Sequence, residues 1–99
     1  MAEKVVDVVT KEKLAKYFDV TGRAIEMVKT TEMDTSRIEN ANDFLDMAQR
    51  YYYDAQHFKS KGDYVLAFAA LNYAHGWLDA GARIGLFKVK DSTLFTVDD

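Results

Sequence analysis

A ridge of polar residues runs through an otherwise apolar stretch near the C-terminal end of the sequence. Its members are spaced by three, four and four residues, which on a helix places them within a sector of about 80°. The ridge combines an imidazole for proton exchange, a carboxylate that can orient a ligand and a guanidinium that can hold an anionic group. With the tyrosine beside them, these are the candidate ligand or partner residues: Asn72, Tyr73, His75, Asp79 and Arg83.

The same ridge has a purely structural interpretation. A solvated strip, or a hydrogen-bonded ladder that sets the register of a bundle, would use the same spacings. If the ridge is buried, Asp79 must be paired, and Arg83, four residues further on, is its natural partner. If the ridge faces water, each neighbouring pair contributes only about 0.3 kcal/mol. The sequence leaves both interpretations open.

The two histidines are not expected to share a metal ion. A turn near Gly62 places His75 opposite about Ala48. His57 then lies about 13 Å away along the axis of the bundle. The sequence also contains no cysteine, which excludes thiolate chemistry, disulfides and cysteine zinc sites. We therefore expect no metal and no cofactor.

A second pair of residues has a spacing found in ribonucleases. The stretch RYYYDAQH places Arg50 and His57 at a separation that resembles the Arg–His motif of the helical HEPN ribonucleases. In that family both residues act on the phosphate at the cleavage site, and the motif belongs to the last helix of the bundle. Here it lies on the second predicted helix, and an ordinary surface position for both residues is the competing interpretation.

Three helices are predicted to position these groups. The sequence contains no proline, where average usage of about 5% would give about five, and such a chain is mostly helical. Thr10 is a suitable N-cap for the first helix, and Ser36 with Glu39 has the spacing of a capping box before the second. Gly62 and Asp63 fit the end of the second helix and the cap of the third. The predicted helices span about 11–33, 37–60 and 63–87.

The predicted fold is all-α: a three-helix antiparallel bundle with a short C-terminal tail, formed by residues 1–99 as one domain. The short connection around Gly62 forces the second and third helices into a hairpin. The third helix is apolar around almost its whole circumference, and such a helix is usually buried on all sides. We expect it to be central, covered by the other two helices and by a second copy of the protein. The tail residues Leu94, Phe95 and Val97 are expected to fold back over an open edge.

Glycines occur within the third helix, although each costs about 1 kcal/mol relative to alanine in a helix interior. Small side chains allow a neighbouring backbone to approach closely, and this packing offsets the cost. Packing between helices is one interpretation, and a groove that admits a ligand or a partner helix is the other. The close-packing glycines are Gly76, Gly81 and Gly85, and small residues recur along one side at Ala67, Ala70, Ala74, Gly81 and Gly85.

The composition indicates a folded protein without a membrane span. Hydrophobic residues make up 48% and charged residues 29%, and no segment reaches the roughly 18 apolar residues that a span needs. The N-terminal residues lack the long apolar region of a signal peptide, so we expect a cytoplasmic protein. The net charge of −3 is small and its acidic residues are scattered. This argues against a broad nucleic-acid surface and leaves a small local basic patch open.

The stretch from Tyr51 to Phe87 resembles an archaeal family of short helical proteins, the domain of unknown function 357. Its most specific parts are GDY at 62–64 and the pattern NYAHG.LDAG.R.G from Asn72 to Gly85, and all of these residues are present. The resemblance implies a helical fold and an archaeal, cytoplasmic origin, but no reaction. Some longer family members join this domain to a nucleotidyltransferase-like domain, which implies a role beside nucleotide or cofactor metabolism.

Two functions from different classes remain as hypotheses. The first is a non-catalytic interaction or assembly module that forms a homo-oligomer or binds a protein partner, because the third helix is apolar all round and no catalytic constellation is recognisable. The alternative is a small-molecule, nucleotide or RNA-phosphate site on the polar ridge. In that case Arg83 holds the anionic group, Asp79 orients it and His75 binds or exchanges a proton. A narrower version, a ribonuclease, depends on His57.

Overall fold

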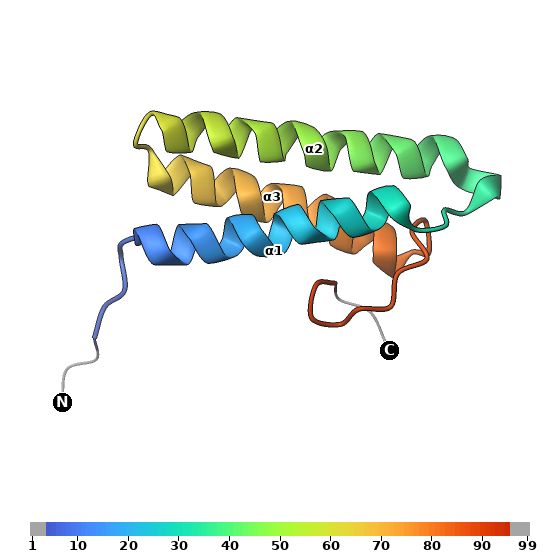
Figure 1. Cartoon of the computed structure of the whole chain (residues 1–99), viewed down its shortest axis with the longest axis horizontal. Coiled ribbons are helices and arrows are strands. Elements are labelled where there is room, and N and C mark those ends of the chain that lie inside the picture. The colour runs from blue at the N-terminus through green and yellow to red at the C-terminus, as the bar shows by residue number, and fades with distance from the viewer. Residues whose placement is uncertain (1–3, 96–99) are drawn as a thin grey trace.

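Three α-helices form an antiparallel bundle in the computed structural model, which describes residues 4–95 (Figure 1). They are α1 (Lys11–Thr30), α2 (Ile38–Ser60) and α3 (Tyr64–Arg83), and a single 3₁₀ turn, η1 (Thr35–Arg37), precedes α2. α1 and α3 run in the same direction, and α2 runs back against both. The predicted all-α three-helix fold is confirmed.

Two of the predicted helix starts are set by local cap chemistry. The Thr10 hydroxyl accepts a hydrogen bond from the Lys13 amide at 3.1 Å. The Asp63 carboxylate accepts one from the Leu66 amide at 3.0 Å. Between α2 and α3, Gly62 adopts a φ of 77°, which residues with a Cβ rarely adopt. This glycine therefore allows the tight turn of the α2–α3 hairpin.

The predicted capping box of Ser36 and Glu39 is wrong. Ser36 lies inside η1, where its amide and hydroxyl donate to the Asp34 carboxylate at 3.0 and 2.7 Å. Arg37 binds the same carboxylate through Nε and Nη2, each at 2.7 Å. Hydrogen bonds from Ser36 and Arg37 to the charged form lower the pKa of Asp34 to about 2. Asp34 is therefore the residue that organises the start of α2.

Arg37 also connects the start of α2 to the segment that follows α3. Its guanidinium donates to the Ile84 carbonyl at 2.8 Å. The connection between α1 and α2 pairs with the same segment through backbone hydrogen bonds, one of which runs from the Asp34 amide to the Leu86 carbonyl at 3.0 Å. We call this group of contacts the clasp, and its residues are Glu32, Asp34, Arg37, Ile84, Leu86 and Lys88.

Both α1 and α3 end a few residues earlier than predicted. α1 stops at Thr30 because the chain after it is extended and joins the clasp. α3 stops at Arg83 because Gly85 takes a φ of 79°. The Leu86 amide then turns back to the Gly81 carbonyl at 2.8 Å, which is the hydrogen bond of a Schellman ending.

The buried core lies between the helices and continues under the C-terminal segment. Leu94 and Phe95 are only 4% and 3% exposed, so the prediction that the tail folds back is confirmed for these two residues. Val97, the third residue of that prediction, lies outside the described residues. The largest fully buried side chains are Leu14, Val28, Leu71, Leu78, Leu86 and Phe87.

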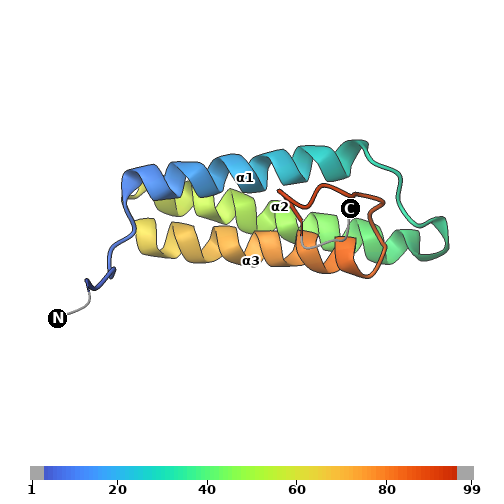
Figure 2. The same cartoon turned by 90° about the horizontal axis from the view of Figure 1, so that it is seen from below.

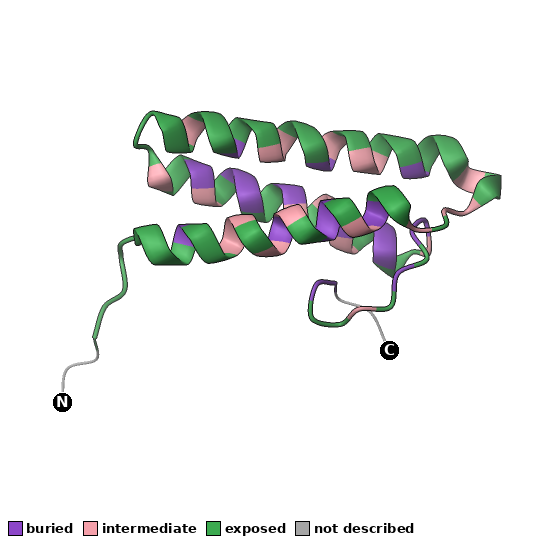
Figure 3. Ribbon diagram, in the orientation of Figure 1, coloured by how far each residue is buried: buried purple, intermediate pink, exposed green. Residues whose placement is uncertain are grey.

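α3 is central but is not covered on every side. One side packs along α2, and a second faces α1 and the C-terminal segment, where Figure 3 shows buried residues; a third side faces neither (Figure 2). On this third side Val65, Tyr73 and Ile84 keep 65%, 57% and 51% of their surface exposed. Within the described chain, α1, α2 and the C-terminal segment therefore leave one side of α3 uncovered, and the expected cover by a second copy stays a prediction.

Candidate functional site

His75 lies half-buried on α3 and links three parts of the molecule. Its Nε2 is 2.6 Å from the Leu94 carbonyl, and because a carbonyl only accepts, Nε2 carries the proton and donates. Its Nδ1 is hydrogen-bonded to the Thr21 hydroxyl on α1 at 3.1 Å. The Phe95 ring stacks against the imidazole with 6.4 Å between centroids. Both nitrogens of His75 thus hold α1 and the C-terminal segment against α3.

A groove of about 440 Å³ lies between α1 and α3 beside His75. Asp79 lines it one turn further along α3, with Oδ1 4.0 Å from His75 Nε2. Lys16 and Tyr17 come from α1, and Asn72 from α3. The lining therefore contains a cation, an anion and neutral polar groups, and it concentrates neither sign of charge.

The polar ridge is divided in the structure. His75 and Asp79, at its centre, are half-buried and adjacent. Asn72 and Arg83, at its two ends, are exposed. Asp79 lies beside the His75 ring, with Oδ1 4.0 Å from Nε2, and among the described residues no ion pair joins it to Arg83, the partner that the sequence indicated. The structure therefore brings together only the middle two members of the ridge.

Tyr73 lies on the uncovered side of α3, where that side borders α2, and away from His75. Its ring centroid is 4.4 Å from that of Tyr51. Nearby, the rings of Phe44 and Trp77 meet edge to face at 5.0 Å. A shallow hollow of about 330 Å³ lies beside these aromatic side chains, and Gly76 forms part of its floor. The sequence indicated Tyr73 as a candidate but gave no sign of this hollow.

A strip of exposed residues runs along α3 from one end to the other. A helix side that faces water is ordinarily polar, whereas this strip is apolar or small at most positions and Arg83 is its only charged member. At 100° per residue the strip occupies one side of the helix. We call it the open face, and its residues are Val65, Leu66, Ala69, Asn72, Tyr73, Gly76, Ala80, Arg83 and Ile84.

The three glycines of the third predicted helix have different surroundings. A Cβ at Gly81 would overlap the Phe87 ring, so glycine at this position allows the C-terminal segment to approach the helix. A Cβ at Gly76 would meet nothing within 4 Å, so no packing among the described residues requires glycine there. Gly85 ends the helix through its positive φ. Close packing within the chain therefore explains Gly81 but not Gly76.

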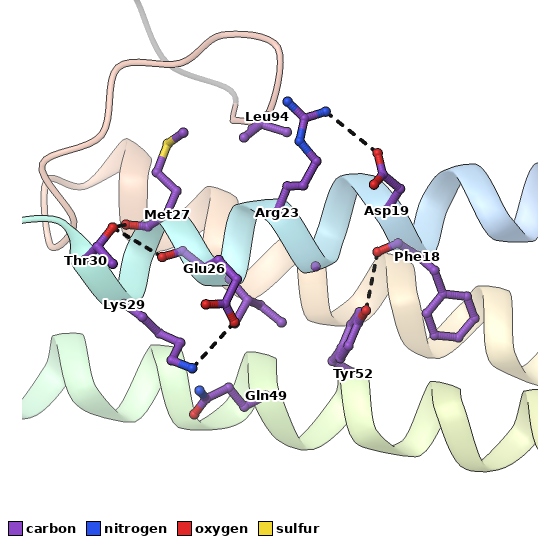
Figure 4. Close-up of a pocket in the computed structure, with 12 residues that line it drawn as sticks. Phe18, Asp19, Arg23, Glu26, Met27, Lys29, Thr30, Gln49, Tyr52 and Leu94 are labelled. Carbon is purple, nitrogen blue, oxygen red and sulfur yellow. Dashed lines mark hydrogen bonds and ion pairs between the residues drawn. The ribbon is translucent and has the colours of Figure 1, made fainter.

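A broad, shallow depression of about 870 Å³ lies over α1 and reaches α2 (Figure 4). The Tyr52 hydroxyl donates to the Phe18 carbonyl at 3.4 Å, and Gly22 makes room, since a Cβ there would lie 2.8 Å from the hydroxyl oxygen. Burial raises the pKa of Tyr52, and the charges of Asp19 and Glu26 raise it further. The hydroxyl therefore acts as a hydrogen-bond donor between helices. This contact was not predicted from the sequence, although Gly22 in the middle of the helix was a signal for it.

Arg50 and His57, the pair with ribonuclease-like spacing, are both exposed on α2. The Arg50 guanidinium is bound to Asp46 at 2.8 Å, and the His57 ring lies 6.0 Å from that of Phe58. Within residues 4–95, no group of three His, Asp or Glu side chains is placed to hold a metal ion. In the same part of the chain, no helix combines the length and apolarity needed to cross a bilayer.

The family model described as "Protein of unknown function (DUF357)" matches residues 16–87. The chain belongs to the DUF357 family. The resemblance found in the sequence is thereby confirmed. The DUF357 match extends from α1 to the clasp, so it includes the groove beside His75 and the whole open face. Neither a curated protein nor a solved structure matches the chain.

Proposed function

We propose that this DUF357 chain is a non-catalytic helical assembly module that binds a second copy of itself through the open face of α3. The observation that carries the proposal is the space over Gly76. Glycine in a helix interior costs about 1 kcal/mol relative to alanine. A Cβ here would meet nothing within 4 Å, so no packing contact in the described part of the chain offsets that cost. A partner that approaches α3 at this point would use the space.

The side chains around Gly76 support a protein partner. Apolar residues that adjoin one another on a surface are typical of interaction sites, whereas single exposed ones are ordinary. The open face carries Val65, Tyr73 and Ile84, each more than half exposed, and Trp77 lies at its border. Interface cores are poor in charged residues, and Arg83 is the only charged member of the open face.

A ligand site on the polar ridge is the weaker proposal. A histidine that binds a ligand or exchanges a proton with it needs a ring nitrogen for that purpose, and both nitrogens of His75 are bound to Thr21 and Leu94. Arg83, which was to hold the anionic group, is exposed at the end of α3. These contacts favour a role for His75 in holding the C-terminal segment in place.

Light scattering at concentrations from about 1 to about 100 µM tests the proposal. The mass of the wild-type chain is expected to rise from 11.3 kDa toward twice that value. Ala80→Glu places a carboxylate in the open face and is expected to shift the midpoint at least about tenfold in concentration, because burying an unpaired charge is costly. Its matched control is Ala15→Glu, at an exposed alanine on α1, which is expected to behave as wild type.

A wild-type chain that stays monomeric over this range would contradict the proposal. So would two glutamate variants that weaken association equally, since the open face would then have no special part in it. Circular dichroism of both variants shows whether the helices are retained.

A further inference from the structure

We infer that two copies of the chain meet in antiparallel orientation, each with its open face on that of the other, and that the twofold axis passes between Tyr73 and Gly76. This inference rests on the proposed function, which names a second copy as the partner, and adds the direction and register in which that copy binds. It comes from the order of large and small side chains along the open face, from the hollow over Gly76 and from the placement of charge at the two ends of α3.

The open face becomes complementary to itself when it is reversed. The large residues lie near its ends and centre, and the small ones lie between them. An interface with twofold symmetry brings the same surface of both copies together. Reversal about a point between Tyr73 and Gly76 places large opposite large at the ends, small opposite small further in, and large opposite small at the centre. The pairs are Val65 with Ile84, Ala69 with Ala80, and Tyr73 with Gly76.

The hollow over Gly76 is the place where this arrangement needs space. It measures about 330 Å³ and is lined by Tyr73, Trp77 and Phe44 among others. In the reversed register the tyrosine of the second copy lies opposite this hollow. A Cβ at Gly76 would reach into the space that this ring needs, and nothing within the described chain fills it. The cost of glycine in mid-helix is thereby explained.

The charges at the ends of α3 favour the antiparallel orientation over the parallel one. Arg83, the only charged member of the open face, lies in the last turn of the helix, and the exposed Asp63 caps its first turn. In the reversed register Arg83 lies opposite position 66, about 4.5 Å along the axis from the partner's Asp63. A parallel pair would instead place Arg83 against Arg83 and Tyr73 against Tyr73. Like charges face to face are destabilising.

Disulfide trapping tests the orientation of the two copies. The sequence has no native cysteine, so only the introduced thiols can form a disulfide. Ala69→Cys and Ala80→Cys replace exposed alanines, so each variant is expected to fold. In the antiparallel register, position 69 of one copy lies directly opposite position 80 of the other. Two copies of the same variant therefore hold their cysteines about 16 Å apart along the axis, too far for a disulfide. Mixing the two variants, one of them with an affinity tag, is expected to give a mixed disulfide dimer under mild oxidation, and each variant alone is expected to stay uncrosslinked.

The matched control is a mixture of Ala69→Cys with Ala15→Cys, which is expected to give no disulfide. Disulfides within each single variant, with none in the mixture, would show a parallel pair and overturn the inference while the proposed function stands. A dimer by light scattering without any of these disulfides would place the interface or register elsewhere and also overturn it. A chain that is monomeric by light scattering overturns the inference together with the proposed function.

Discussion

Gly81 and Gly76 lie five residues apart on α3, and their surroundings are opposite. At Gly81 the helix is closed: the Phe87 ring occupies the space that a Cβ would need, and Phe87 itself is 1% exposed. At Gly76 the helix is open, and a Cβ would meet nothing within 4 Å. The two glycines have the same cost in helix propensity. The chain supplies the neighbour for one of them and, in the part described, supplies none for the other.

A glycine in a helix allows a close approach but does not identify the neighbour that approaches. At the closed end, the clasp and the C-terminal segment turn the chain back onto α3, so the neighbour is local to the molecule. At the open face, Gly76 lies among Asn72, Tyr73 and Ala80, with one side toward solvent. We interpret the open glycine as a contact that is completed by a second copy.

Replacing each glycine by alanine is expected to give the largest difference in stability between the two positions. Gly81→Ala is expected to lower the free energy of unfolding by about 1–3 kcal/mol, because the methyl group overlaps the Phe87 ring and forces repacking. Gly76→Ala is expected to raise it by up to about 1 kcal/mol, because helix propensity improves and nothing is displaced. Urea unfolding followed by circular dichroism, at a concentration where the chain is monomeric, measures both changes.

The two variants are controls for each other, since the chemical change is identical. Gly76→Ala is also expected to associate more weakly than wild type by light scattering, although its monomer is more stable. Changes of the same sign in the stability of both variants, or stronger association of Gly76→Ala, would remove the distinction between the closed and open positions.

Lowering the pH is expected to have a smaller effect on stability, and this effect is confined to the clasp. Hydrogen bonds from Ser36 and Arg37 lower the pKa of Asp34 from its ordinary value of 3.8 to about 2. The folded state has the lower pKa, so the contribution of this carboxylate is fully present above pH 3.8 and is lost as the pH falls from there toward about 2. Thermal melts across this interval are expected to fall less steeply for Asp34→Asn than for wild type. Equal slopes would show that the acid sensitivity comes from elsewhere.

The parts of the fold that the sequence predicted depend on local chemistry. Thr10 and Asp63 cap helices because a short side-chain oxygen reaches the amide three residues later, and Gly62 turns the chain because it lacks a Cβ. The bounds of α2 were predicted to within one residue, but the capping residue before it was not, because Asp34 takes the place expected of Ser36. Arg37 binds Asp34 and also the Ile84 carbonyl, so a contact across the molecule decides which residue organises that turn.

The candidate site was predictable as a set of residues but not as an arrangement. The spacing of His75 and Asp79 correctly placed them side by side. It could not show that Thr21 and the Leu94 carbonyl use both nitrogens of the ring, because these partners come from distant parts of the chain. The apolar circumference of α3 indicated burial on all sides. Only the packing of α1 and α2 shows which side they leave open.

Trp77 offers the most direct measurement of the central claim, that the open face of α3 is the interface. It is the single tryptophan of the sequence and lines the hollow over Gly76. Its emission is expected to move to longer wavelength, and to become easier to quench with acrylamide, as the wild-type chain is diluted through the monomer–dimer transition. Ala80→Glu is expected to show the diluted spectrum at every concentration at which it is monomeric. Emission that stays constant while light scattering records dissociation would place the interface away from this face and contradict the account.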